Sequence, residues 1–243
     1  MSTALLAIGL SAAGALLVLA TGQGTRAGAL AGFAVATLVT AGLGVAAFVP
    51  LAMFVLGSGA LTRLGRAAKE ARGSGEANEG RRGAAHVAAK LTLPALCGAL
   101  GLARVGPPGL PALAATAALC GAFADTAATE VGPLLGGRVY GLERGRVVVL
   151  AHGAAGGVSL PGLLAALLAS AAVALSAWAP GLLRSPDGVA ASAAAGFAAS
   201  LVESIVARSA LGARMGHHGR NAAVSVLSAG GVLTARWMGW IGA

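Results

Sequence analysis

Charged and aromatic side chains are scarce in this chain of 243 residues. Charged residues make up 10% of the sequence and aromatic residues 4%, whereas a soluble globular domain carries roughly 25% charged residues. The shortage of charge excludes a soluble domain with a solvated surface. Instead, 57% of the residues are hydrophobic and the mean hydropathy is +0.83. These values are typical of a polytopic membrane protein.

Cysteines and alternating apolar patterns are also rare. The two cysteines, Cys97 and Cys120, lie in apolar segments without metal-ligand spacing, and we interpret them as small core residues. The apolar runs are continuous and lack a period of two, which excludes a transmembrane β-barrel. The net charge of +9 comes from basic residues in short loops. That distribution is a topology signal, so no nucleic-acid partner is expected.

Glycine and alanine are abundant, and small residues allow transmembrane helices to pack closely. We therefore predict an all-α, polytopic transmembrane helical bundle that forms a single domain over residues 1–243. Hydropathy and breaks at Gly, Pro and charge indicate about eight spans, with seven as the alternative. The expected spans are 4–20, 27–44, 45–61, 84–103, 110–130, 156–179, 189–206 and 221–241. The first is interpreted as a retained span because no basic region precedes it.

Basic residues predict the orientation of these spans. Thirteen Lys and Arg residues lie in the odd-numbered loops, six of them in the basic loop 62–83, and only Arg104 and Arg184 lie in the even-numbered loops. By the positive-inside rule the odd loops face the cytoplasm and the N-terminus lies outside the cell inner membrane. This split favours eight spans over seven.

A short acidic segment interrupts the fifth apolar run. Residues 124–130 (ADTAATE) contain two of the eight acidic residues of the chain, Asp125 and Glu130. A buried carboxylate is costly unless it meets a cation, a partner or a cavity, so it usually has a function. Thr126 and Thr129 lie beside these acids, and Glu203 lies in a later span. We therefore predict a Mg²⁺ site whose ligands are Asp125, Glu130 and Glu203.

Phosphate-binding residues are predicted on the same membrane face. Gly156, Gly157 and Ser159 are expected at a helix start, where free N–H groups suit an anion. Lys90 lies inside a span, so an acid or a phosphate is its expected partner. Three further polar residues are expected near the same face, Arg82, Ser204 and Asn221. The adjacent His217 and His218 are interpreted as solvated loop residues, and His152 stays ambiguous.

Four ordered segments resemble the integral membrane family that contains phytyl-phosphate kinase and transmembrane protein 19. They are residues 54–90, GAFADTAATEVG (121–132), GGVSLPG (156–162) and GFAASLVES (196–204). Together they span about three quarters of the chain in the family's order. The chain departs from the family's usual residues at His86, Lys90, Ala127 and Glu203, and in the turn Gly153–Ala155.

The resemblance implies an enzyme that transfers a phosphoryl group from CTP, or another nucleotide, to an isoprenoid monophosphate. In this hypothesis Mg²⁺ is held by Asp125 and Glu130, and Glu203 is either a third ligand or a base. The charge that develops on the phosphates is neutralised by Lys90 and Arg82. A related alternative is nucleotidyl transfer that forms a CDP-lipid at the same site. The alternative from another class is a transporter of a small molecule or ion, which requires polar residues at mid-membrane and on both faces.

Overall fold

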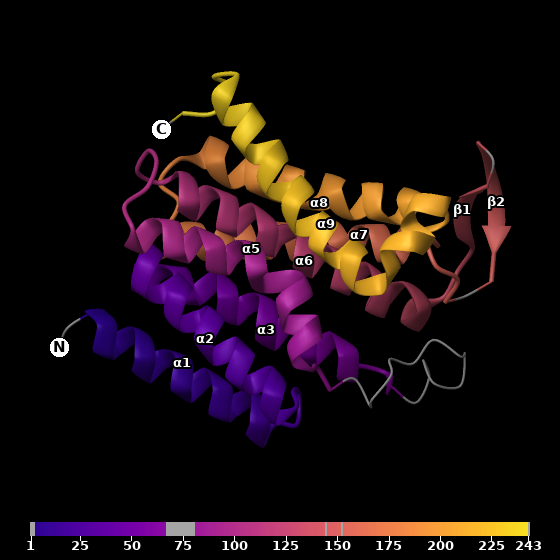
Figure 1. The fold of residues 1–243 in the computed structure, drawn as a ribbon. Helices are drawn as coiled ribbons and strands as arrows, with labels where there is room; N and C mark the ends of the chain where they lie inside the picture. Colours follow the sequence, from indigo (N-terminus) through magenta and orange to yellow (C-terminus); the bar gives the residue numbers. More distant parts are fainter. Residues whose placement is uncertain (1–2, 67–80, 144, 152, 243) are drawn as a thin grey trace.

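The computed structural model describes residues 3–66, 81–143, 145–151 and 153–242, and it is a helical bundle with one small β-hairpin (Figure 1). Helices account for about three quarters of the described chain. The elements are α1 (Thr3–Ala20), α2 (Arg26–Leu43), the 3-10 turn η1 (Val45–Ala47), α3 (Phe48–Arg63), α5 (Ala84–Leu102), α6 (Leu110–Leu135), β1 (Val139–Glu143), β2 (Arg146–Leu150), α7 (Leu160–Trp178), α8 (Pro186–Ala207) and α9 (Ala210–Trp237).

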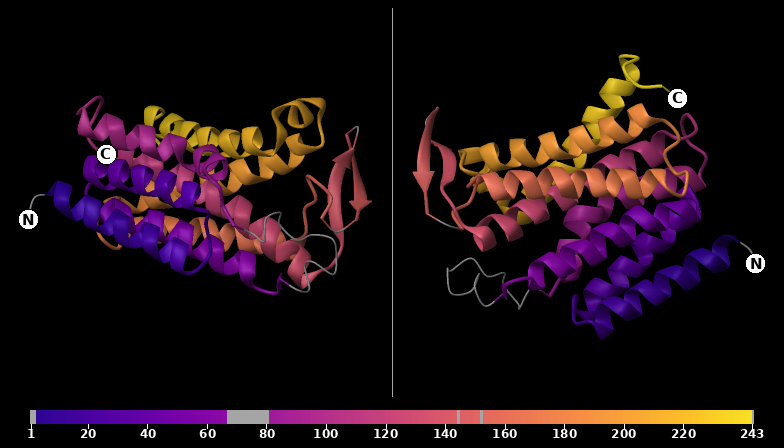
Figure 2. Two further views of the ribbon diagram at one scale, coloured as in Figure 1. Left: turned by 60° about the horizontal axis from the view of Figure 1, so that its bottom comes forward. Right: turned by 180° about the vertical axis from the view of Figure 1, so that it is seen from behind.

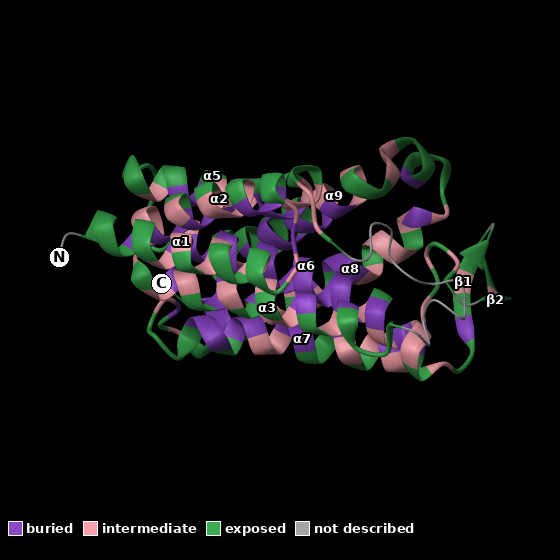
Figure 3. Ribbon diagram, turned by 90° about the horizontal axis from the view of Figure 1, so that it is seen from below, coloured by how far each residue is buried: buried purple, intermediate pink, exposed green. Residues whose placement is uncertain are grey.

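Helix α6 forms the centre of the bundle and is buried along most of its length. It packs against α3, α5, α7, α8 and α9. Helix α1 lies at the edge, where it packs mainly against α2 and leaves most of its surface exposed (Figures 1 and 3). The sequence explains this difference, because α6 is rich in alanine and small polar residues on every face, whereas α1 carries exposed leucines suited to lipid.

The helices approach closely where glycines face one another. Gly42 of α2 lies against Gly98 of α5, and a Cβ atom at Gly98 would lie 2.6 Å from the carbonyl oxygen of Leu38. Gly196 of α8 lies similarly close to the backbone of α6 at Cys120 and Gly121. A side chain at these positions would overlap the backbone of the neighbouring helix. The glycines therefore allow the helices to pack closely.

We expect Gly98→Leu to lower the free energy of unfolding by about 1–3 kcal/mol or more, because the larger side chain must push α2 and α5 apart. Thermal unfolding in detergent would measure the loss. The matched control is Gly9→Leu, since a Cβ atom at Gly9 would meet nothing within 4 Å. Equal melting temperatures for the two variants would contradict the close contact between α2 and α5.

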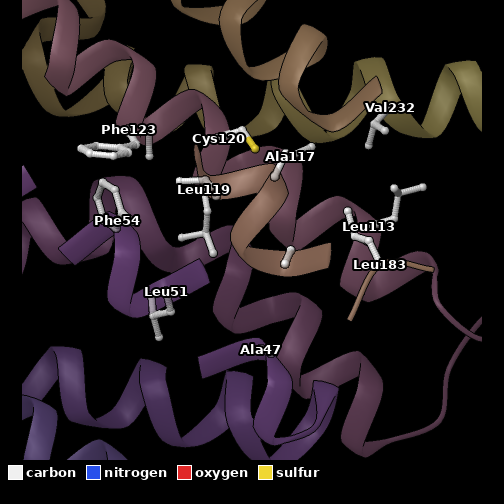
Figure 4. Packing of buried hydrophobic residues seen from close by; sticks show 14 of the residues in the cluster. Ala47, Leu51, Phe54, Leu113, Ala117, Leu119, Cys120, Phe123, Leu183 and Val232 are labelled. Carbon is white, nitrogen blue, oxygen red and sulfur yellow. The ribbon is translucent and has the colours of Figure 1, made fainter. Parts of the chain in front are cut away.

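Larger apolar side chains fill the interior around α6. Phe54 of α3 meets Phe123 of α6 edge to face, with ring centroids 6.3 Å apart (Figure 4). Leu119 and Cys120 are also buried there. Both cysteines are buried and free, which confirms their interpretation as core residues.

All-α bundle architecture is confirmed, with seven helices long and apolar enough to cross a membrane within the described ranges. Helix α9, which contains the expected span 221–241, is not among the seven because arginines and histidines interrupt it. Its backbone also leaves helical geometry at Gly216. Seven was the alternative because only a Gly-rich stretch and Pro50 separate the expected spans 27–44 and 45–61, but those two are separate candidate spans, and the eighth expected span is the one that hydropathy does not support. Helix α9 still runs the length of the bundle against α5, α6 and α8 (Figure 1).

Three of the expected boundaries were wrong, and one element was not expected. Helix α9 begins at Ala210 rather than 221. Helix α6 continues to Leu135, so Glu130 and Asp125 lie about one and three turns before its end. Helix α7 begins at Leu160 rather than 156, because Ser159 has an extended backbone and caps the helix. The strands β1 and β2 form an antiparallel hairpin that the sequence analysis did not predict. The β-branched run Val147–Val149, which follows the turn residue Gly145, was the available signal.

The loops predicted to be basic gather at one end of the bundle. The connections from α1 to α2, from α6 to α7 and from α8 to α9, together with the end of α3 and the start of α5, lie toward the same end of the bundle as the hairpin (Figures 1 and 2). The N-terminus, the C-terminus and the other connections lie at the opposite end. Below, the end with the hairpin is called the basic end. Of the basic loop 62–83, residues 67–80 lie outside the described residues, as does His152.

Candidate functional site

A polar cavity of ≈ 440 Å³ opens at the basic end of the bundle. Its walls come from α5, α6, α8, α9 and the turn that leads from the hairpin into α7. Most of the residues predicted from the sequence line it, namely Lys90, Asp125, Thr126, Thr129, Glu130, Gly156, Gly157, Ser159, Glu203, Ser204 and Asn221. Segments up to 130 residues apart in the sequence therefore meet in one site.

At the bottom of the cavity, Lys90 and Asp125 form a buried ion pair. Lys90 Nζ lies 2.8 Å from Asp125 Oδ2, and the two residues are 3% and 9% exposed. The ammonium group also donates to Thr126 Oγ1 at 2.8 Å and to the carbonyl oxygen of Ala122 at 3.2 Å. Of the two partners expected for Lys90, the structure therefore shows the acid. Because both groups are buried, removal of either charge would leave the other without compensation, which is strongly destabilising.

Glu130 belongs to a second polar chain, which extends away from the cavity. Thr62 of α3 donates to Glu130 Oε1 at 2.5 Å and accepts from an Arg82 guanidinium nitrogen at 3.0 Å. Arg82 itself does not line the polar cavity, contrary to its expected place among the phosphate-binding residues. Thr62 thus contacts both the Arg82 guanidinium and the Glu130 carboxylate.

Glu203 is held by Arg220 of α9, whose Nε donates to Glu203 Oε1 at 2.8 Å. Asp125, Glu130 and Glu203 thus line one cavity, yet each interacts with a different protein group. Within the described residues, no three His, Cys, Asp or Glu side chains lie close enough together to hold a metal ion. The predicted triad of metal ligands is therefore not assembled. Magnesium bound here would need phosphate and water oxygens beside one or two carboxylates, which is its common arrangement.

The glycine turn closes the mouth of the cavity. Gly156 has φ +68° and packs against the backbone of α8 at Ser204, while Gly157 packs against Val139 of the hairpin. Ser159 caps α7, and its Oγ accepts from the Gly162 N–H at 3.3 Å. The glycines therefore precede the helix instead of opening it, and the cap of α7 is already occupied by a hydroxyl.

Hydroxyl and amide groups complete the lining. Thr129 donates to the carbonyl oxygen of Asp125 at 3.0 Å, and Ser204 donates to that of Ser200 at 3.2 Å. Asn221 lies 3.1 Å from His217 Nε2. Partial burial lowers the pKa of His217, and nearby Lys90 lowers it further. The neutral ring nitrogen can then accept from the Asn221 amide.

Several site residues were missed by sequence reasoning. His86, His217 and Arg220 line the cavity, and Thr62 connects Glu130 to Arg82. The histidine pair was assigned to a loop, whereas it lies on α9, one residue after the kink at Gly216. Arg220 was counted only as a topology charge. Its position 17 residues after Glu203, the acid of the preceding apolar segment, was the available signal.

The fold and the cavity define a polytopic integral membrane protein with a buried ionic site at one end. The family model of the integral membrane protein DUF92 matches residues 9–224. The chain belongs to this integral membrane family. No solved structure matches it.

Two curated relatives extend this finding. An uncharacterized membrane protein of Synechocystis sp. is 36% identical over 161 residues, which cover 65% of this chain and 60% of the relative. Protein VTE6, chloroplastic, of Arabidopsis thaliana is 31% identical over 149 residues, which cover 60% of this chain and 44% of the relative. The chain spans about half the length of these relatives. The resemblance to the phytyl-phosphate kinase-like family is confirmed.

Proposed function

We propose that this protein transfers a phosphoryl group from CTP, or another nucleoside triphosphate, to an isoprenoid monophosphate at the basic end of the bundle. The observation that carries the proposal is the buried pair of Lys90 and Asp125 at the base of a polar cavity. Similarity to VTE6 supports a kinase-like activity. Phosphoryl transfer depends mainly on positioning and on charge stabilisation, and both are available in this cavity.

In this proposal Lys90 exchanges its partner when substrate binds. The ammonium group turns from Asp125 toward a phosphate oxygen, while Thr126, which already accepts from Lys90, holds it in place. Asp125 and Glu130 would hold Mg²⁺, which would neutralise charge on the nucleotide phosphates. Glu203 stays ionically paired with Arg220 and positions it beside the cavity. The Gly156–Gly157 turn lines the cavity and leaves room for the phosphates, while the Gly157 N–H donates to the carbonyl oxygen of Ala154 at 3.0 Å.

The orientation predicted from the loops places this cavity in the cytoplasm, where nucleotide is available. We expect a membrane-impermeant maleimide to label Pro108→Cys in intact cells and Val147→Cys only after permeabilisation. Both positions are exposed, at the end opposite the cavity and on the hairpin respectively. The native cysteines are buried and serve as an unreactive background. The reverse labelling pattern would place the site outside the cytoplasm.

Labelled nucleotide tests the reaction itself. Purified protein incubated with geranylgeranyl monophosphate, Mg²⁺ and γ-labelled CTP is expected to yield labelled geranylgeranyl diphosphate. With α-labelled CTP the label should remain in CDP. Label in the lipid from α-labelled CTP would instead identify a CDP-lipid-forming nucleotidyltransferase. Uptake of a prenyl phosphate into proteoliposomes without nucleotide would identify a transporter.

A further inference from the structure

A second cavity, of ≈ 290 Å³, lies beside the polar one between α1, α2, α3 and α5. Its lining is almost wholly apolar, with Leu10 and Val18 on α1, Ala36 on α2, Leu51 and Phe54 on α3, and Leu91 on α5. We call it the apolar groove. None of the reaction chemistry described above uses it.

The groove exists because α1 packs mainly against α2 and does not close over α3 and α5. Small residues face it from both outer helices, including Gly14 of α1 and Gly32 of α2. A Cβ atom at Gly32 would meet nothing within 4 Å. An unfilled apolar space of this size between helices is costly unless a ligand occupies it. Exposed α1 at its edge gives the groove lateral access to the bilayer.

Two residues line both cavities, and each presents a side-chain nitrogen that can contact a phosphate oxygen. His86 and Lys90 of α5 face the apolar groove and the polar cavity together, and Arg82 lies at the same end of the groove. The Nε2 atom of His86 is buried and has no hydrogen-bond partner among the described residues. The groove is thus apolar along its length and cationic at the end that meets the reaction site.

We infer that one lipid phosphate occupies both cavities, with its isoprenoid chain in the apolar groove and its phosphate between His86 and Lys90. The inference rests on the proposed function, because that function supplies the isoprenoid monophosphate. The inference adds where the isoprenoid chain binds and which groove residues recognise that chain. A single flexible chain fits a groove of this volume, whereas a two-chain phospholipid would have to leave one chain outside.

Photocrosslinking tests the placement of the chain. The probe is a geranylgeranyl monophosphate analogue with a diazirine at the end of its chain, added to purified protein in detergent without nucleotide. We expect adducts on residues 28–36 of α2 and 48–56 of α3. Gly32→Phe should reduce these adducts about tenfold or more, the loss expected when roughly two buried methylene groups are displaced. Isopentenyl monophosphate, which is too short to reach Gly32, should bind both proteins equally.

The matched control is Gly9→Phe, which adds the same ring at an exposed position of α1 with open space around it. It should leave the adducts unchanged, and both variants should retain the wild-type melting temperature. Adducts spread over the outer helix faces, or equal in the two variants, would overturn the inference. If phosphoryl transfer occurred despite such a result, the proposed function would stand alone. Adducts in the groove without transfer would support the inference and reject the kinase.

Discussion

Asp125→Asn is expected to lower the rate of phosphoryl transfer on the order of 10²–10³-fold or more, the size of effect that follows the loss of one preorganised charge contact. The amide keeps the shape of the side chain but cannot balance the Lys90 ammonium or hold a cation. Initial rates of formation of the labelled lipid diphosphate would measure the loss.

The control for this variant is Asp187→Asn. Asp187 is exposed in the first turn of α8, at the end of the bundle opposite the polar cavity. It undergoes the same chemical change and should retain the wild-type rate. An Asp125→Asn protein that works as well as Asp187→Asn would reject the role of the buried pair in the reaction.

Lys90→Met is expected to lower the free energy of unfolding by about 3–5 kcal/mol, because it leaves the Asp125 carboxylate buried without its cation. The double variant Lys90→Met/Asp125→Leu should regain most of that stability, since two apolar side chains can replace a buried pair. It should nevertheless remain inactive. Chemical unfolding in detergent and the labelled-nucleotide assay measure the two properties separately.

This pair of variants distinguishes a structural ion pair from a functional one. If the double variant were as unstable as the sum of the single variants, Lys90 and Asp125 would not be coupled. If the double variant were stable and active, the pair would serve packing alone. Only stability without activity agrees with a site whose charges are retained for binding phosphate.

Much of the fold could be predicted from the sequence because lipid imposes simple rules. Continuous apolar runs predicted every helix but α9 within about five residues, and abundant glycine predicted close packing of the kind seen at Gly98. The end of α6 was missed because Glu130, Gly132 and Pro133 indicate a break, whereas the helix continues through them to Leu135. The low hydropathy of α9 was missed because the expected span began at 221. The helix begins earlier and includes Arg214, His217, His218 and Arg220.

The members of the site were predictable, but their partners were not. Buried acids in an apolar sequence are costly, so Asp125, Glu130 and Glu203 could be singled out before any geometry was known. Which cation meets which acid depends on how helices rotate against one another. Lys90 therefore pairs with Asp125 and Arg220 with Glu203, an arrangement that spacing along the chain does not encode. For the same reason the acids line one cavity without forming the expected triad of metal ligands.

The position of bound phosphates tests the account most directly. A structure of the protein with geranylgeranyl monophosphate and a non-hydrolysable CTP analogue should place a lipid phosphate within hydrogen-bonding reach of Lys90 Nζ, with the nucleotide phosphates between Asp125 and the Gly156–Gly157 turn. Phosphates bound at the opposite end of the bundle, with Lys90 and Asp125 still joined and the cavity filled only by water, would contradict it.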